Sequence, residues 1–431
     1  MKDYMRDLIQ RRGNGEKCGI SSFCTANSLV IEACLERGKC FDDCVLIEAT
    51  ANQVNQFGGY TGMRPADFRD FVFEIADRIG FPTDRIILGG DHLGPLTWSN
   101  LPEAEAMKNS VELVKEFVLA GYKKIHLDTS MRLADDSRDE MLKNSVIARR
   151  GAVLYKACED AYAELVKNNP EETRPVFIIG SEVPIPGGAQ QEESGIDVTK
   201  PEALEATLEA YRKAFADEGI QDAFDNIIGV VVQPGVEFGD NDFFTYNREK
   251  ASSLTACASA HKQIVLEGHS TDYQPASALK EMVEDGIAIL KVGPALTFGL
   301  REGLFALDTM EKLLIAEAEQ ADFRGVLEKT MLADPKNWIK HYHGTEDEIR
   351  LKRMFSFSDR CRYYLTNPDV ADAQKKLLDN MANVQIPMGM LHQYMPIQYY
   401  KVRDGKLKMD PKELVKDFVG IFIDDYNYAC E

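Results

Sequence analysis

Hydrophobic and polar positions follow two alternating patterns along the first three quarters of the chain. Short apolar runs, typical of strands buried on both faces, are followed by longer stretches with apolar residues at helical spacing. Eight such rounds can be counted from about residue 17. The expected strands are residues 19–24, 45–50, 86–90, 124–128, 176–181, 227–233, 263–268 and 287–292. Several of the helical stretches between them end in glycine, as helices commonly do.

Eight strand-helix rounds favour an α/β fold of the (β/α)8 TIM-barrel type. A doubly wound open sheet is the alternative, but no glycine-rich dinucleotide fingerprint or P-loop follows the first expected strand. From about residue 318 the alternation is lost and helical patterns dominate. We therefore expect a barrel over residues 1–317 and a mainly helical C-terminal extension, packed on it, over residues 318–431.

Composition and charge narrow the class of protein. The chain has 431 residues, 44% of them hydrophobic, and a formal net charge of -20. This charge argues against nucleic acid and anionic membranes as partners. No apolar run is long enough to cross a bilayer, and the N-terminus does not resemble a signal peptide, so we expect a cytoplasmic protein. The 9 cysteines form no Cys-x-x-Cys pair, which indicates reduced thiols.

Polar residues are concentrated where the expected strands end. Asp91 and His92 follow the third strand, Asp128 ends the fourth, Glu182 follows the fifth and His269 follows the seventh. In a (β/α)8 barrel these positions converge on one face, where catalytic residues are usually found. Ionised carboxylates are costly at buried strand ends unless they are paired or bound to metal. We therefore expect a cation at this face.

The histidines suggest which residues hold that cation. His92, His269 and Glu182 together would form a site for a divalent metal, with zinc foremost and manganese or magnesium as the other candidates. The alternative is that each histidine only forms a hydrogen bond in its loop. His126 lies two residues before Asp128, so strand alternation points both side chains the same way. It is a ligand, a partner of a ligand or a core histidine, and the sequence leaves these three open.

Two loops are candidates for substrate binding. Barrels commonly bind phosphate at the loops after strands seven and eight, through backbone N–H groups and a helix N-terminus. The alternative is that the glycines there only allow tight turns. The loop at residues 56–62 is either a lid over the barrel mouth or a simple turn. The candidate binding residues in these loops and before them are Gly268, Ser270, Lys291, Gly293, Gln53, Gly59 and Tyr60.

Several of these motifs resemble one protein family. They are residues 48–50 (EAT), 52–63 (NQVNQFGGYTGM), 89–95 (GGDHLGP), 180–184 (GSEVP), 267–272 (EGHSTD) and 356–360 (SFSDR) with 362–364 (RYY). The sequence resembles the larger, Z-type subunit of class II D-tagatose-1,6-bisphosphate aldolase, and the likeness covers essentially the whole chain.

The resemblance implies roles for the strand-end residues. The family is similar in plan to class II fructose-bisphosphate aldolases, which hold zinc on histidines after strands three, six and seven. By that likeness Asp91 transfers protons, His92 and His269 are metal ligands, and Glu182 is a ligand or lies near one. Residues 232–237 (VQPGVE), at strand six, contain no histidine. Glu182, or else Gln233 or Glu237, would then supply the missing ligand.

The activity expected from this resemblance is metal-dependent retro-aldol chemistry on a ketohexose phosphate. The reaction is either cleavage of tagatose 1,6-bisphosphate or 4-epimerisation between tagatose 6-phosphate and fructose 6-phosphate. Asp91 or Asp128 takes the C4 hydroxyl proton. Arg360 or Arg362 holds the C6 phosphate, or else these arginines are only surface charges. A kinase is not expected, because no loop resembles a nucleotide phosphate cradle. The alternative is a non-catalytic subunit that stabilises a smaller catalytic aldolase subunit, and a homo-oligomer is expected in either case.

Overall fold

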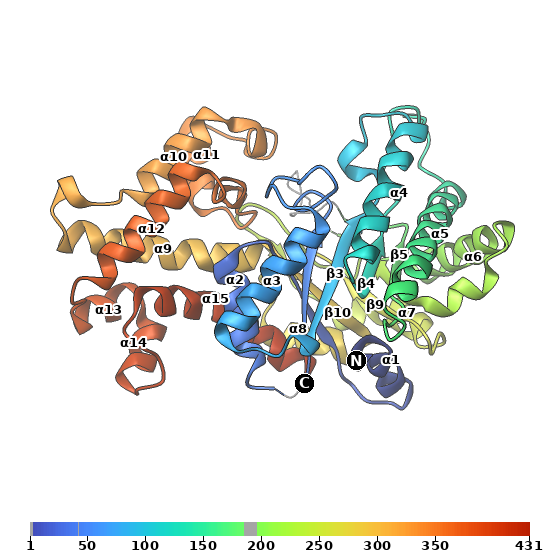
Figure 1. The fold of residues 1–431 in the computed structure, drawn as a ribbon, viewed down its shortest axis with the longest axis horizontal. Coiled ribbons are helices and arrows are strands. Elements are labelled where there is room, and N and C mark those ends of the chain that lie inside the picture. The colour runs from blue at the N-terminus through green and yellow to red at the C-terminus, as the bar shows by residue number, and fades with distance from the viewer. Residues whose placement is uncertain (1–2, 42, 185–195) are drawn as a thin grey trace.

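The computed structural model describes residues 3–41, 43–184 and 196–431, and its centre is a closed barrel of parallel strands (Figure 1). The strands neighbour one another in the order β1-β10-β9-β6-β5-β4-β3-β2. Their bounds are β1 Ile20–Cys24, β2 Val45–Thr50, β3 Ile86–Leu93, β4 Lys124–Leu127, β5 Val176–Gly180, β6 Ile227–Val232, β9 Val265–Gly268 and β10 Ile287–Val292. The closed barrel confirms the (β/α)8 prediction and excludes the open sheet. The remaining two strands, β7 Glu237–Phe238 and β8 Phe243–Phe244, pair as a small separate hairpin.

The third strand is longer than the sequence pattern indicated. It was expected to stop at Gly90, but β3 continues to Leu93. Both glycines are required by packing on opposite faces of the strand, because a Cβ atom on Gly89 would lie 2.3 Å from Glu48 Oε1 inside the barrel and one on Gly90 would lie 2.5 Å from Leu93 Cδ1 and 2.7 Å from Phe117 of the helical layer. Asp91 and His92 belong to the strand itself, at an irregularity in its pairing with β4, and His92 has a left-handed φ of 48° there.

Helices follow the barrel strands and form its outer layer. They are α2 Ser28–Gly38, α3 Pro65–Ile79, α4 Glu103–Leu119, α5 Asn144–Asn168, α6 Pro201–Asp217, α7 Arg248–Ala258, α8 Ala276–Glu284 and α9 Pro294–Leu314. Their ends follow ordinary capping chemistry. The Asn27 side chain accepts hydrogen bonds from the first N–H groups of α2, and α3 ends at Gly80 with a φ of 69°. None of the helices in the described ranges is both long and apolar enough to span a membrane.

The chain after α9 is helical and partly rejoins the barrel. Its helices are α10 Phe323–Ala333, α11 Glu346–Phe355, α12 Pro368–Ala382, α13 Met388–Tyr394, α14 Pro396–Arg403 and α15 Pro411–Cys430. Helices α10 to α14 gather around the outer part of α9, which points away from the barrel (Figure 1). Helix α15 returns to pack along α9 and against α8 and α2. Gly299 and Gly303 permit this approach, since a Cβ on either would lie about 3 Å from α15.

The inside of the barrel is apolar at one end and charged at the other. Leu46, Ile87, Ile178, Val265 and Ile289 fill the end near the start of the strands. The first helix, α1 (Tyr4–Gly13), covers this end and places Met5 against the same cluster. Further along the strands the inward positions become charged, so the polar side chains meet at the carboxyl ends of the strands, where the sequence predicted them.

Gly94 marks where β3 and β4 approach too closely for a side chain. A Cβ atom there would lie 1.8 Å from the backbone oxygen of Asp128, which cannot move without shifting the end of β4. We expect Gly94→Ala to lower the free energy of unfolding by about 1–3 kcal/mol, as overpacking does elsewhere. Urea unfolding measures this. Gly389→Ala is the control, because nothing lies within 4 Å of its new Cβ. An equal effect of both substitutions would contradict this explanation.

Candidate active site

Three histidines and one aspartate meet at the carboxyl ends of the barrel strands. Asp91 and His92 come from β3, His126 from β4, and His269 directly follows β9. One potential ligand atom from each residue lies within 4.8 Å of the other three. The imidazole ring centres are 4.9 to 5.1 Å apart, and all four residues are buried. The structure therefore brings together the residues predicted at strands three and seven, with His126 as an added member.

Each of the three histidines contacts its own carboxylate. The contacts are His92 Nδ1 to Asp128 Oδ2 (2.8 Å), His126 Nδ1 to Asp91 Oδ1 (3.0 Å) and His269 Nε2 to Glu267 Oε1 (2.8 Å). His126 Nδ1 also lies 3.2 Å from the backbone N–H of His92, which donates to it, whereas at His92 and His269 a carboxylate that accepts the ring N–H leaves the lone pair on the other ring nitrogen. This arrangement is the one that histidine ligands of metals usually show, because the carboxylate fixes both the tautomer and the ring orientation.

The ring nitrogens that do not hydrogen-bond to a carboxylate are suited to bind a divalent metal. His126 Nε2 is buried and has no hydrogen-bond partner in the described part of the chain. Burial lowers the pKa of His269 to about 4, so this ring is neutral at pH 7 and can act as a ligand. Three imidazoles beside one carboxylate form a donor set that suits zinc. Of the three roles left open for His126, this position favours that of a metal ligand, since the ring lies among the potential ligands.

Asp91 is the acid of the cluster that faces open space. Its Oδ2 lies 2.9 Å from Lys291 Nζ, and the residue lines the cavity described below. Burial favours the neutral acid, but Lys291 and His92 outweigh it and hold the pKa of Asp91 well below its usual value. Asp128 differs, because it does not line this cavity and its oxygens contact His92, the Ser130 hydroxyl (2.6 Å) and the Ser130 N–H (3.1 Å). Of the two acids expected to move a proton, Asp91 is the better placed.

A buried network of ion pairs supports the cluster from inside the barrel. Lys124 Nζ lies 2.8 Å from Glu48 Oε1 and 2.7 Å from Glu267 Oε2. Glu48 also pairs with Lys291, which joins the network to Asp91. Burial lowers the pKa of Lys124, but Glu267 and Glu48 outweigh it, so the ammonium remains charged. Sequence reasoning missed Lys124, although it alternates with His126 and Asp128 along β4 and so shares their inward face.

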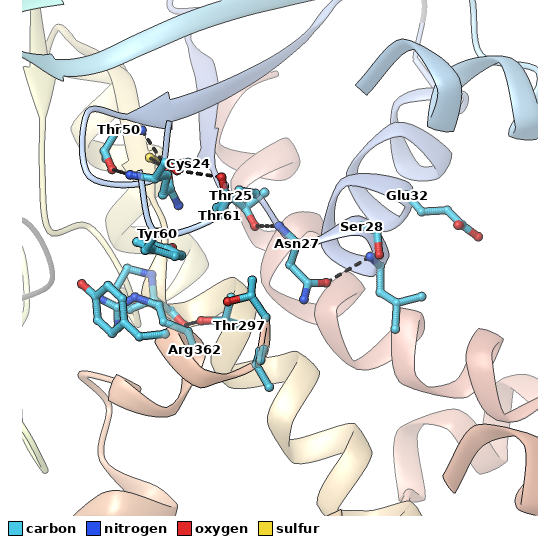
Figure 2. Close-up of a pocket in the computed structure, with 18 of the residues that line it drawn as sticks. Cys24, Thr25, Asn27, Ser28, Glu32, Thr50, Tyr60, Thr61, Thr297 and Arg362 are labelled. Carbon is cyan, nitrogen blue, oxygen red and sulfur yellow. Dashed lines mark hydrogen bonds between the residues drawn. The ribbon is translucent and has the colours of Figure 1, made fainter. Parts of the chain in front are cut away.

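A cavity of about 830 Å³ opens above the cluster, and Figure 2 shows part of its lining. Asp91, His92 and His269 line it together with residues of the C-terminal extension. Tyr60 and Tyr363 both line it and contact each other edge to face, with ring centres 5.0 Å apart. The loop at residues 56–62 therefore contacts the extension at the cavity. This loop also needs a tight turn, because a Cβ on Gly59 would lie 2.3 Å from Gln53 O.

The residues expected to complete the ligand set lie outside the cluster. Glu182 is exposed and accepts a hydrogen bond from Thr199 Oγ1 at 2.6 Å. The side-chain oxygen of Gln233 accepts from the N–H groups of Gly235 and Val236. Glu237 is buried on the β7-β8 hairpin. His126 stands in the cluster instead, whereas roles for Glu182 in metal binding or catalysis remain predictions.

The predicted phosphate loop is largely occupied by the protein's own groups. Asp272 Oδ1 accepts hydrogen bonds from the N–H groups of Gly293 (3.1 Å) and Ala295 (2.8 Å) at the start of α9. The ammonium of Lys291 is bound by Glu48 and Asp91. The nearest contact of a Cβ on Gly268 would be Ile287 at 2.9 Å, so this glycine is required for packing.

The other predicted binding residues differ in whether they line the cavity. Gln53, Tyr60 and Ser270 line the cavity. Arg360 is not part of the lining and is buried, with its Nη2 2.9 Å from His341 Nδ1. Arg362, its neighbour on the short helix η6 (Arg360–Tyr364), does line the cavity.

The buried Asp272 carboxyl group predicts how the stability of the protein changes with pH. Burial raises its pKa to about 6 from 3.8, so between these values the native state binds more protons than the unfolded state. The contribution of Asp272 to stability is therefore present at low pH and lost as the pH rises to 6. We expect Asp272→Asn to gain about 2–3 kcal/mol in unfolding free energy, relative to wild type, between pH 4 and pH 7. Urea unfolding across that range measures it, and a constant difference would contradict the assignment.

Two solved structures are similar to this chain to different degrees. A crystal structure of a probable tagatose 6 phosphate kinase from Sinorhizobium meliloti 1021 is 43% identical, with a TM-score of 0.87 over 96% of this chain and 100% of that chain. A putative fructose-1,6-biphosphate aldolase from Coccidioides immitis is 14% identical, with a TM-score of 0.42 over 88% of this chain and 99% of that one. The second likeness is too weak to carry an argument.

The strongest finding concerns the whole chain. Residues 5–431 match the sequence profile of the family described as D-tagatose-1,6-bisphosphate aldolase subunit GatZ/KbaZ-like. This agrees with the resemblance carried by the motifs around Asp91, His92 and His269. The chain belongs to the D-tagatose-1,6-bisphosphate aldolase subunit GatZ/KbaZ-like family.

Proposed function

We propose that the chain catalyses retro-aldol chemistry on a ketohexose phosphate, with a divalent cation held by His92, His126 and His269. Zinc is the first candidate, and manganese and magnesium are the others. The observation that carries the proposal is the cluster itself, in which three carboxylate-bound imidazoles and Asp91 lie buried at the base of a cavity. A purely structural barrel gains nothing from so many costly polar groups at this position.

The chemistry divides between the cation and the side chains. When bound, the cation supplies Lewis-acid polarisation of a substrate carbonyl. Asp91 accepts the C4 hydroxyl proton, and the C3–C4 bond then breaks, with its electron pair moving towards C2. Lys291, 2.9 Å from Asp91, keeps that carboxylate ionised before the transfer. Asp128 and Glu267 act indirectly, because they orient His92 and His269.

The fate of the aldehyde fragment decides the overall reaction. Its release from tagatose 1,6-bisphosphate makes the protein an aldolase. Its rotation and re-addition through the other face makes the protein a 4-epimerase of tagatose 6-phosphate and fructose 6-phosphate. Tyr60 and Tyr363 border the cavity in mutual contact, which favours retention of the fragment and exclusion of water.

The word kinase in the name of the Sinorhizobium meliloti relative is not carried over to this chain. Phosphate transfer from a nucleotide uses a phosphate-cradling loop, such as Gly-x-x-x-x-Gly-Lys-Ser/Thr, and this sequence contains none. The alternative to an enzyme remains a non-catalytic subunit that stabilises a smaller catalytic aldolase subunit, as the family description includes the word subunit.

Product analysis on the purified chain alone tests the proposal. Protein stripped of metal and then given zinc, manganese or magnesium is incubated with each of the three sugar phosphates, and products are followed by NMR. Interconversion of the monophosphates identifies an epimerase, and triose phosphates from the bisphosphate identify an aldolase. Turnover only after addition of a smaller aldolase subunit, unchanged by His92→Ala, would refute the catalytic proposal and support the accessory role.

A further inference from the structure

Arg362 is distinguished from the other cations that line the cavity. In the described part of the chain these are Arg78, Lys291, Arg362, Lys375 and Lys412. The other four have carboxylate partners, namely Arg78 with Glu32 (2.6 Å), Lys412 with Glu32 (3.0 Å), Lys375 with Asp379 (2.6 Å) and Lys291 with Asp91 (2.9 Å). Among the described residues Arg362 has no carboxylate oxygen within 4.0 Å. Its positive charge is therefore available to a ligand.

The guanidinium of Arg362 is held by neutral groups. Its Nη1 donates to the backbone oxygens of Ser358 and Asp359, and its Nη2 donates to the Tyr363 hydroxyl at 3.1 Å. The guanidinium carbon lies 4.5 Å from the centre of the Tyr363 ring. These bonds use three of the five N–H groups that an arginine carries, which leaves donors for an oxyanion.

The segment that carries these carbonyls is fixed on both sides. Ser356 donates through its hydroxyl to Asp240 at 2.8 Å, next to the β7-β8 hairpin. Asp359, with a left-handed φ of 47°, receives hydrogen bonds from Thr297 (2.7 Å) and Arg301 (2.8 Å) of α9. The SFSDR motif thus attaches the extension to the barrel and presets the position of the guanidinium, which reduces the entropy lost on binding.

Two phenols complete the surroundings. Tyr60, from the loop after β2, lies beside Arg362 at the cavity (Figure 2). Tyr363 accepts a hydrogen bond from Arg362 and so retains its own O–H for a ligand. Burial raises the pKa of Tyr363, but Arg362 and Arg360 outweigh it and lower that pKa below its usual value, which makes the phenol a better donor.

The other position where an anion is commonly bound is already filled. The N-terminus of α9 donates to Asp272, and Lys291 is paired with Asp91 and Glu48. The sequence of residues 185–195 contains no lysine or arginine that would add a cation. The second phosphate of a bisphosphate would therefore face no unpaired cation in the described parts of the cavity.

We infer that Arg362, with the hydroxyls of Tyr60 and Tyr363, binds the phosphate of the substrate, and that the cavity takes a phosphate monoester in preference to a bisphosphate. The identity of the sugar rests on the proposed function, whereas the anion site rests on the cavity alone. Among the two reactions proposed above, this assignment favours exchange between hexulose monophosphates over cleavage of a bisphosphate.

Calorimetric titration of the metal-free full-length chain tests the anion site without relying on turnover. Inorganic phosphate, tagatose 6-phosphate and tagatose 1,6-bisphosphate are titrated separately. We expect Arg362→Gln to weaken binding of phosphate and of the monophosphate at least tenfold, and Arg362→Lys to have an intermediate effect. Lys375→Gln removes another cavity cation and should change either affinity less than twofold. The bisphosphate should bind wild type no more tightly than the monophosphate.

Three results would overturn the inference. The first is that the wild-type protein shows no phosphate binding at concentrations up to about 10 mM, on the order of the weakest affinity worth assigning to a site. The second is that Arg362→Gln binds phosphate with wild-type affinity and keeps the wild-type melting temperature. The third is tighter phosphate binding by Asp272→Ala with no loss in Arg362→Gln, which would place the anion at α9. Loss of phosphate binding in Arg362→Gln, combined with a wild type that never turns over, would support the anion site and refute only the proposed function.

Discussion

Replacing Asp91 by asparagine is expected to reduce turnover of the sugar phosphate by about 10²- to 10⁴-fold, the range usually lost with a general base. Asparagine keeps the shape of the side chain but cannot accept the C4 hydroxyl proton. Because Asp91 also contacts His126 Nδ1 at 3.0 Å, the substitution should lower metal affinity by about 10- to 100-fold, and turnover is therefore compared at saturating metal. Steady-state kinetics on metal-loaded protein, together with elemental analysis, measures both quantities.

A matched control separates this effect from a general loss of charge in the cavity. Asp379 also borders the cavity, but it is an exposed residue of α12 that pairs with Lys375. Asp379→Asn should change kcat less than twofold. If Asp91→Asn retained more than a tenth of the wild-type kcat, Asp91 would not be the proton acceptor, and the role would have to move to another group at the cavity.

Replacing Lys124 by methionine is expected to lower the free energy of unfolding by about 3–5 kcal/mol, the usual cost of removing one partner of a buried ion pair. Lys124 is fully buried, and its ammonium neutralises both Glu48 and Glu267. Methionine fills a similar volume, so the loss reports on charge and not on a cavity. Glu267 would also hold His269 less firmly, so zinc affinity should fall by about 10- to 100-fold. Urea unfolding and zinc titration measure the two effects.

Two further variants check that explanation. Lys143→Met removes an exposed lysine whose Nζ lies 3.7 Å from Glu140, and it should change stability by less than about 0.5 kcal/mol. Adding Glu267→Gln to Lys124→Met removes one uncompensated charge and should recover part of the lost stability. A loss below about 1 kcal/mol in Lys124→Met would show that the lysine is not needed to neutralise the network.

The barrel could be predicted from sequence because short, mostly apolar runs alternate with helical patterns eight times along the chain. The end of β3 could not, because Gly89 and Gly90 act through contacts with Glu48 and Leu93 that only the folded barrel shows. The place of α15 was also missed. Nothing in its sequence indicates that this helix, which begins almost 100 residues after the end of α9, packs against α8 and α2.

Part of the candidate site could also be predicted from the sequence, because the fold class determines where the strand ends meet. Asp91, His92 and His269 stand at strand ends, and convergence of those ends follows from the fold class. His126 could be placed on the inward face but not assigned, because its role depends on contacts with Asp91 and His92. Glu182 was predicted from its position after strand five; its carboxylate accepts a hydrogen bond from Thr199, and its role in the site stays a prediction. Asp272 was not recognised as the group that occupies the α9 N-terminus.

The central claim is that His92, His126 and His269 hold a cation on which turnover depends. Its most direct test is to add zinc stepwise to metal-stripped protein and measure both bound zinc and the rate of conversion between tagatose 6-phosphate and fructose 6-phosphate. The account predicts a rate that rises in proportion to bound zinc and stops rising at one ion per chain, with neither binding nor turnover in His126→Ala. A rate independent of bound zinc, or full zinc binding by His126→Ala, would contradict it.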